Sequence, residues 1–513
     1  MSIEYFVEGK VIVQTKGDNI SFSKGDIVYN SEKSIIQRGA ETGVSYGEPR
    51  KIHPNDKPIS TIDVTLNLFF DGTQNNKTNT QAGKNHKKSN HKDDSYTNDY
   101  SNVARGFDAT DPSAENQVRV YIEGIGTEDL KSDDVFPDVA FGTGDRGVIA
   151  KVAKGCIEGA KALERKFSDV KKQINLTVNV FGFSRGATAA RHFIYVATNP
   201  AKIFSTGSGF FALSPYDAPS LKNAVYMKEK SSLADSFGFF GACLAAKKLQ
   251  IASIQFKFAG LYDTVASYGP NHRGGWGFND DTKQLSLDAI GNGKVNFVLQ
   301  IAADDEYRDN FDLTNINSAG LYGLEFTLPG VHSDIGGSYV DGEKEVSVLY
   351  CQKGSIINDI FFNIEEECKK FKEILIDEGW YKDEELEIKS FYQSDLDPDI
   401  LWTKDSSSFY GIIGTRVLSN SYDKVALNLV FHYSQNKKTG GVKYLDSSLK
   451  RHQIEEEFLT RIYNQLTRYT NACNDLRNEY IAKYLRGEST ADYLTEIKKI
   501  SYLDFVDEQD LKN

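Results

Sequence analysis

The segment around residues 174–196 constrains the fold more than any other part of the chain. A β-branched, apolar run leads into Gly182-Phe183-Ser184-Arg185-Gly186, and an alanine-rich stretch follows. The run predicts a buried strand, and the stretch after it predicts a helix. Small residues on both sides of the serine let the backbone turn sharply between the two. We therefore expect Ser184 to lie on a tight turn at the carboxyl end of a strand.

Other apolar runs predict that this strand belongs to a larger sheet. The expected strands are residues 64–70, 118–122, 174–181, 254–262, 295–302 and 324–329. Helical periodicity occurs between them, for example over residues 148–171. Alternating strands and helices are typical of a mostly parallel sheet flanked by helices. The fold class expected is α/β, of the α/β-hydrolase type.

Changes of pattern along the chain predict three regions. Residues 1–60 combine short strands with a linker and are expected to be a small β-rich N-terminal module. Residues 61–345 form the expected catalytic domain, and residues 346–513 a largely helical C-terminal region. An insert at about residues 203–250 contains apolar, Gly-containing segments, which favour either a lid or core helices. The polar residues 77–100 are expected to form a loop.

Composition excludes several classes of function. A formal net charge of -12 argues against a nucleic-acid binder, which needs a basic face. The five cysteines are scattered without a Cys-x-x-Cys pair, so neither a disulfide framework nor a zinc site is expected. The first residues lack the basic start and apolar stretch of a signal peptide, and no run approaches the ~18 apolar residues of a transmembrane helix. We expect a soluble chain made in the cytoplasm.

A serine nucleophile needs a base and an acid that orients the base, and in this fold they follow the serine in the order acid, histidine. His332 is the expected base because it sits in a glycine-rich bend after the strand at 324–329, and His272 is the alternative. Asp263 ends the strand at 254–262 and is the expected acid. Asp304 and Asp305, after the next strand, compete with it.

Backbone N–H groups are expected to stabilise the oxyanion. They belong to Arg185, at the start of a helix, and to Gly72 and Thr73, in the loop after the first core strand. No metal and no cofactor is required for this chemistry. A second glycine-rich stretch, residues 142–147, resembles a phosphate loop but lacks the Lys-Ser/Thr pair that completes one, so a nucleotide-dependent enzyme is a weaker alternative.

Seven motifs together resemble one family. They are residues 69–76, 124–127, 142–144, 182–187, 263–265, 305–308 and 330–337. Their order and content are similar to those of the uncharacterised α/β-hydrolase domain family that includes the first family of type VI secretion lipase effectors. The resemblance covers roughly residues 62–345. Carried over by position, it makes Ser184 the nucleophile, Asp263 the acid and His332 the base. Tyr262 and Ser338 stand where the family usually has Trp and Gly.

The resemblance implies a phospholipase A that acts on membrane phospholipids of competing bacteria. It further implies a cognate immunity protein and a spike or tube component of the type VI secretion system as partners. The chain would then be made in the bacterial cytoplasm without a signal peptide and delivered to the target-cell periplasm. Two alternatives stay open: an esterase or thioesterase of soluble substrates, and a non-catalytic interaction protein with a vestigial serine turn.

Overall fold

The computed structural model divides the chain into two compact units, Met1–Ile59 and Ser60–Asn513. The residues that the structure describes all belong to the second unit, and they are residues 61–85, 93–134, 142–170, 172–216, 224–267, 284–308, 311–353, 358–392 and 408–507. The β-rich module expected at residues 1–60 therefore lies outside the described residues.

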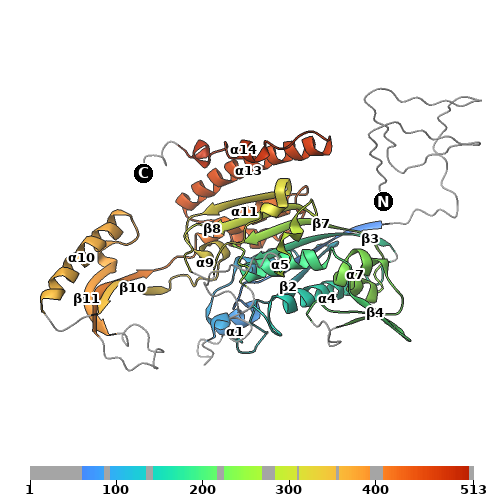
Figure 1. Ribbon diagram of the computed structural model, residues 1–513, viewed down its shortest axis with the longest axis horizontal. Coiled ribbons are helices and arrows are strands. Elements are labelled where there is room, and N and C mark those ends of the chain that lie inside the picture. The colour runs from blue at the N-terminus through green and yellow to red at the C-terminus, as the bar shows by residue number, and fades with distance from the viewer. Residues whose placement is uncertain are drawn as a thin grey trace, which may run out of the picture. The chain divides into compact units, whose positions relative to one another are not determined.

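A six-stranded sheet with the order β2-β1-β3-β7-β8-β9 forms the centre of the second unit (Figure 1). The strands are β1 (Thr61–Phe70), β2 (Gln117–Ile122), β3 (Gln173–Phe183), β7 (Ile251–Tyr262), β8 (Val295–Ala303) and β9 (Gly323–Leu328). Every neighbouring pair is parallel. The expected α/β fold is confirmed, and all the carboxyl ends of the strands lie at one edge.

Helices cover both faces of the sheet, because successive side chains of a strand point to opposite sides. On one face Leu66 and Leu68 pack in a core with α4 (Val148–Phe167), α5 (Arg185–Val196) and α7 (Gly238–Ala246). On the other, Phe69 packs in a core with α3 (Asn102–Ala109), α11 (Asp423–Gln435) and α13 (Glu457–Leu485). Two C-terminal helices thus complete the core of the sheet.

The insert begins with a small antiparallel sheet and ends in a core helix. Strands β4 (Ile203–Thr206), β5 (Gly209–Ala212) and β6 (Val225–Met227) are followed by α6 (Ser232–Ser236) and α7. Every residue from Gly238 to Leu244 is buried, and the ring of Phe240 contacts Phe193 of α5. The α7 segment of the insert is therefore a core helix.

The polar stretch at 77–100 was expected to be a loop, and where it is described this is wrong. It contains α1 (Lys77–Asn85) and α2 (Asp94–Thr97), while residues 86–92 lie outside the described residues. The Oδ1 atom of Asn76 accepts the N–H groups of Thr78 and Asn79 in the first turn of α1, and the buried Asn79 side chain donates to Ser95 Oγ. Polar side chains hold these helices in place, so no apolar periodicity marks them.

The C-terminal region also contains a three-stranded sheet. Strands β10 (Lys344–Lys353), β12 (Ser408–Val417) and β11 (Leu386–Tyr392) are antiparallel, and α10 (Asn358–Asp377) packs against them. The described residues also form the short helices α9 (His332–Gly336), α12 (Asp446–Arg451), α14 (Tyr493–Ile497), η3 (Leu287–Ile290), η4 (Asn317–Tyr322), η5 (Asp383–Glu385) and η7 (Tyr502–Phe505). Within the described ranges, no helix is long and apolar enough to cross a membrane.

Candidate active site

Ser184 lies between β3 and α5 with a strained backbone. Its φ is 57° and its ψ is −131°, a conformation that a residue with a Cβ rarely adopts. The Ser184 N–H donates to the carbonyl oxygen of Tyr262, and its own carbonyl accepts N–H groups from the first turn of α5. These bonds hold the strained turn at the carboxyl edge of the sheet. The predicted strand, turn and helix are all present.

The glycines beside Ser184 are required by close packing. A Cβ on Gly182 would lie 2.5 Å from the Cα of Ala187, so β3 and α5 could not approach as they do. A Cβ on Gly186 would lie 2.3 Å from the carbonyl oxygens of Phe70 and Asp71. The serine turn is therefore packed directly against the end of β1.

His332 and Asp263 are brought together. The Nδ1 atom of His332, at the start of α9, lies 2.6 Å from Oδ2 of Asp263, which follows β7. The other carboxylate oxygen of Asp263 accepts the N–H of Ala303. Both side chains are buried, and among the described residues the Nε2 atom of His332 has no hydrogen-bond partner. A carboxylate on Nδ1 directs the basic lone pair of a neutral imidazole to Nε2.

Two aromatic rings fix the imidazole of His332 and link it to the serine turn. The ring of Phe183, the residue before Ser184, lies 4.6 Å from the imidazole between centroids, and the ring of Phe311 lies 4.9 Å away edge-on. A Cβ on Gly336 would lie 1.9 Å from the ring of Phe183, so α9 depends on glycine for its approach. Helix α9 and the serine turn are therefore both packed on the side chain of Phe183.

The acidic residues after β8 support the loop that carries His332. Oδ2 of Asp305 accepts the N–H of Gly330, so this competing carboxylate contacts the loop backbone and not the imidazole. Oε2 of Glu306 accepts the N–H of His332, a role that the sequence did not predict. Burial raises the pKa of Glu306, but the hydrogen bonds from Arg308 and His332 outweigh it and bring the pKa to about 2. Glu306 therefore remains a charged acceptor.

The loop after β1 contacts the serine turn at two points. A Cβ on Gly72 would lie 2.6 Å from the ring of Phe183, and Oγ1 of Thr73 accepts a hydrogen bond from Nε of Arg185. The N–H of Gly72 donates to Oδ1 of Asp71, 2.8 Å away. Of the two N–H groups in this loop that were predicted for an oxyanion site, that of Gly72 already donates to Asp71.

Comparison with known proteins identifies the family of the chain. The family model for the catalytic domain of Tle1-like phospholipase effectors of the type VI secretion system matches residues 65–357. The chain belongs to this family. A search of curated proteins gives no match.

Solved structures that resemble the Tle1-like chain include a Tle1 effector bound to the VgrG spike, with 22% identity, 80% of each chain covered and a TM-score of 0.48. Another is an uncharacterized protein from Pseudomonas aeruginosa, with 17% identity over 56% of this chain and 43% of that one, and a TM-score of 0.32. Esterase 2 from Thermogutta terrifontis has 10% identity over 63% of this chain and 86% of that one, with a TM-score of 0.23.

The other candidates from the sequence, an alternative base and a glycine-rich stretch, are not part of the described site. His272, the alternative base, is outside the described residues. In the glycine-rich stretch, the carbonyl of Gly142 accepts the first N–H of α4, and a Cβ on Gly147 would lie 2.4 Å from that carbonyl. This stretch therefore caps a helix. In the described part of the chain, no cluster of His, Cys, Asp and Glu could hold a metal ion.

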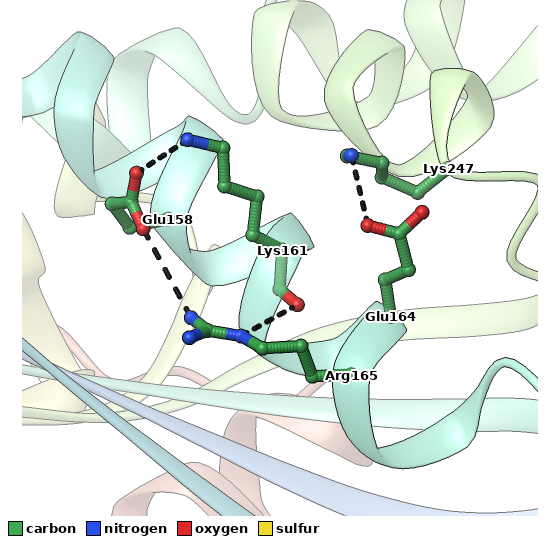
Figure 2. A pocket seen from close by; sticks show the side chains of 5 residues that line it. All are labelled: Glu158, Lys161, Glu164, Arg165 and Lys247. Carbon is green, nitrogen blue, oxygen red and sulfur yellow. Dashed lines mark hydrogen bonds and ion pairs between the residues drawn. The ribbon is translucent and has the colours of Figure 1, made fainter.

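Figure 2 shows a surface hollow between α4 and Lys247, the residue after α7. It is lined by Glu158, Lys161, Glu164, Arg165 and Lys247, which form ion pairs with one another. Farther along α4, Lys166 bonds to the backbone at the start of β2, so this part of α4 lies toward the amino ends of the strands. Ser184 is at their carboxyl ends, and the hollow takes no part in the site.

Proposed function

We propose that this chain is a phospholipase A that hydrolyses acyl esters of membrane phospholipids, with Ser184 as nucleophile, His332 as base and Asp263 as the acid that orients it. The observation that carries the proposal is the 2.6 Å contact between His332 Nδ1 and Asp263 Oδ2 beside a strained serine turn. Membership of a phospholipase effector family supports the lipid substrate.

The reaction is acyl transfer in two steps. Nε2 of His332 takes the proton of Ser184 Oγ as the oxygen attacks the ester carbonyl carbon. The tetrahedral intermediate then expels the lysophospholipid oxygen, which receives this proton, and an acyl-serine remains. Water attacks the acyl-serine with the same histidine as base, and the fatty acid leaves. Asp263 stabilises the imidazolium in both steps.

Backbone N–H groups stabilise the negative oxygen of each tetrahedral intermediate. The donors that we propose are Arg185, at the start of α5, and Thr73, whose N–H makes no hydrogen bond to the described residues. A helix N-terminus adds a favourable dipole at this place. The Gly72 N–H, which the sequence predicted as a donor to the oxyanion, donates to Asp71 instead. It supports the oxyanion site only by holding the loop in position.

The family also supports a biological setting. Because the matching model describes effectors of the type VI secretion system, we propose that a spike or tube component carries the chain into competing bacteria. There it degrades phospholipids from the target-cell periplasm, and a cognate immunity protein protects the producing cell. Co-purification of the full chain with spike proteins, and survival of competitors that express the immunity gene, test this setting.

Fatty-acid release from phospholipid vesicles tests the chemistry. We expect Ser184→Ala to abolish release, while Ser434→Ala, which removes a buried hydroxyl from α11, leaves release unchanged. Equal release by wild type and Ser184→Ala would disprove the serine mechanism. His332→Ala is expected to be inactive and His272→Ala active, and the opposite pattern would transfer the base to His272. Preference for soluble short-chain esters over vesicles would instead favour an esterase.

A further inference from the structure

Asp71 is a buried carboxylate beside the serine turn to which the triad assigns no role. It follows β1 directly, next to β3 in the sheet, and it is 1% exposed. A buried carboxylate is costly unless hydrogen bonds compensate for its lost hydration. Among the described residues, Asp71 has no cationic hydrogen-bond partner, and burial raises its pKa to about 6 despite the bonds that it accepts. Burying such a carboxylate costs folding free energy, and a function for Asp71 would explain that cost.

Three donors converge on the Asp71 carboxylate. Oδ1 accepts the N–H of Gly72 at 2.8 Å and the hydroxyl of Ser101 at 2.5 Å, and Oδ2 accepts the hydroxyl of Tyr121 at 2.5 Å. Each donor belongs to a different segment. Ser101 caps α3, and Tyr121 lies on β2 and accepts the first N–H of α1. The carboxylate therefore fixes the direction in which the chain leaves β1.

The loop that Asp71 fixes lies on the serine turn. Gly72 packs on the ring of Phe183, and Thr73 accepts a hydrogen bond from the side chain of Arg185. The Gly72 N–H is turned back to Asp71, and the next N–H in the chain, that of Thr73, makes no hydrogen bond to the described residues and can bind a ligand. Donors for an oxyanion act only when they are held in place before the reaction.

We propose that Asp71 is a positioning residue, which holds the Gly72–Thr73 loop through the Gly72 N–H so that the Thr73 N–H stabilises the oxyanion formed at Ser184. This inference rests on the proposed serine mechanism and assigns Asp71 no contact with substrate. It predicts an effect on the chemical step, because the oxyanion exists only in the transition state and intermediates, and little effect on ground-state binding.

The matched control is Glu123, which follows the neighbouring strand β2. It is also a buried carboxylate, but its partners are Lys151 and Lys154 of α4. Replacing Glu123 therefore disturbs the fold next to the loop without removing the Gly72 hydrogen bond. Comparing the two positions separates loss of positioning from loss of stability.

The experiment measures kcat and KM on a soluble phospholipid with short acyl chains, at a temperature where each variant is folded by circular dichroism. We expect Asp71→Ala to lower kcat about 100-fold, as for loss of one oxyanion donor, with KM within about twofold. Tyr121→Phe keeps the Gly72 bond and should retain most of kcat. Glu123→Ala should keep kcat within about twofold of wild type, even if its melting temperature falls as far as that of Asp71→Ala.

A kcat of Asp71→Ala within about threefold of that of Glu123→Ala, or a change in KM alone, would overturn the proposal. If Asp71→Ala does not fold, Asp71→Asn tests the proposal instead. Its amide oxygen is a neutral and therefore weaker acceptor for the Gly72 N–H. We expect its kcat to lie about 10-fold below that of wild type and about 10-fold below that of Glu123→Gln. Equal kcat for these two would also overturn it. Full activity of Ser184→Ala would instead disprove the serine mechanism, and this result is distinct from failure of the Asp71 proposal alone.

Discussion

Asp263 and Glu123 are buried carboxylates that follow parallel strands of the same sheet, yet their surroundings differ. Asp263, after β7, faces the imidazole of His332, and its second oxygen accepts one backbone N–H. Glu123, after β2, faces the ammonium groups of Lys151 and Lys154, which lie 2.9 and 2.6 Å from its Oε1. In both cases the residue lies directly after the carboxyl end of a strand. The partner decides whether the carboxylate contacts an imidazole or closes an ion pair.

The largest expected effect is at Asp263. Asp263→Asn preserves size but presents an amide N–H toward Nδ1 of His332, which favours the tautomer with its proton on Nε2. By analogy with serine proteases, we expect kcat to fall about 10³- to 10⁴-fold, with little change in melting temperature. Steady-state kinetics on a short-chain phospholipid measures the change. A loss below about 10-fold would show that another acid orients the base, and Asp304→Asn and Asp305→Asn would then identify it.

The next effect is on stability, at Glu123. Removing one partner of a buried ion pair leaves the ammonium of Lys151 uncompensated, so we expect Glu123→Ala to lower the free energy of unfolding by about 3–5 kcal/mol. Urea denaturation measures it. The double variant Glu123→Leu with Lys151→Met should recover much of the loss. If neither variant changed the free energy of unfolding, the ion pair of Glu123 would not stabilise the fold, and this difference from Asp263 would be disproved.

The pH dependence of stability sharpens the same contrast. Burial raises the pKa of Glu123, but the two ammonium groups and their hydrogen bonds outweigh it and lower the pKa from 4.5 to about 2. A depressed pKa in the folded state contributes stability above pH 4.5 that is lost as the pH falls through 2, here about 3 kcal/mol. Unfolding free energies of wild type and Glu123→Gln should therefore converge in acid. A constant difference across this range would contradict the expectation.

The smallest effect is expected for an exposed ion pair of the surface hollow. Nζ of Lys247 lies 2.8 Å from Glu164, a shorter distance than in the buried pair of Lys151 and Glu123, but both side chains are about a third exposed (Figure 2). Water screens such a pair, so Glu164→Gln should change the free energy of unfolding by less than about 0.5 kcal/mol. The same denaturation assay tests it. A loss above about 1 kcal/mol would show that burial does not separate the two pairs.

Local sequence patterns predicted the architecture around the serine. The strand, turn and helix about Ser184 follow from apolar runs and small residues that are adjacent in the chain. The parallel sheet with helices on both faces follows from the alternation of such runs. These features depend on near neighbours, which is why they could be predicted.

Contacts between distant segments could not be predicted in the same way. Asp263, Asp304 and Asp305 all end strands, and only the folded chain shows that Asp263, 69 residues before His332, is the one at the imidazole. Sequence patterns likewise did not predict that Asp305 and Glu306 accept backbone N–H groups of the loop that carries His332. The triad remains a prediction that the activity assays must test.

The sequence by itself determined where a strained serine turn lies and in what kind of sheet, because strand, turn and helix propensities act over a few residues. Only the tertiary structure decided that α11 and α13 from the end of the chain cover one face of that sheet, and that Asp71 turns the Gly72 N–H away from the expected oxyanion site. Both are decided by burial and hydrogen bonding between segments far apart in the chain, which no local pattern records.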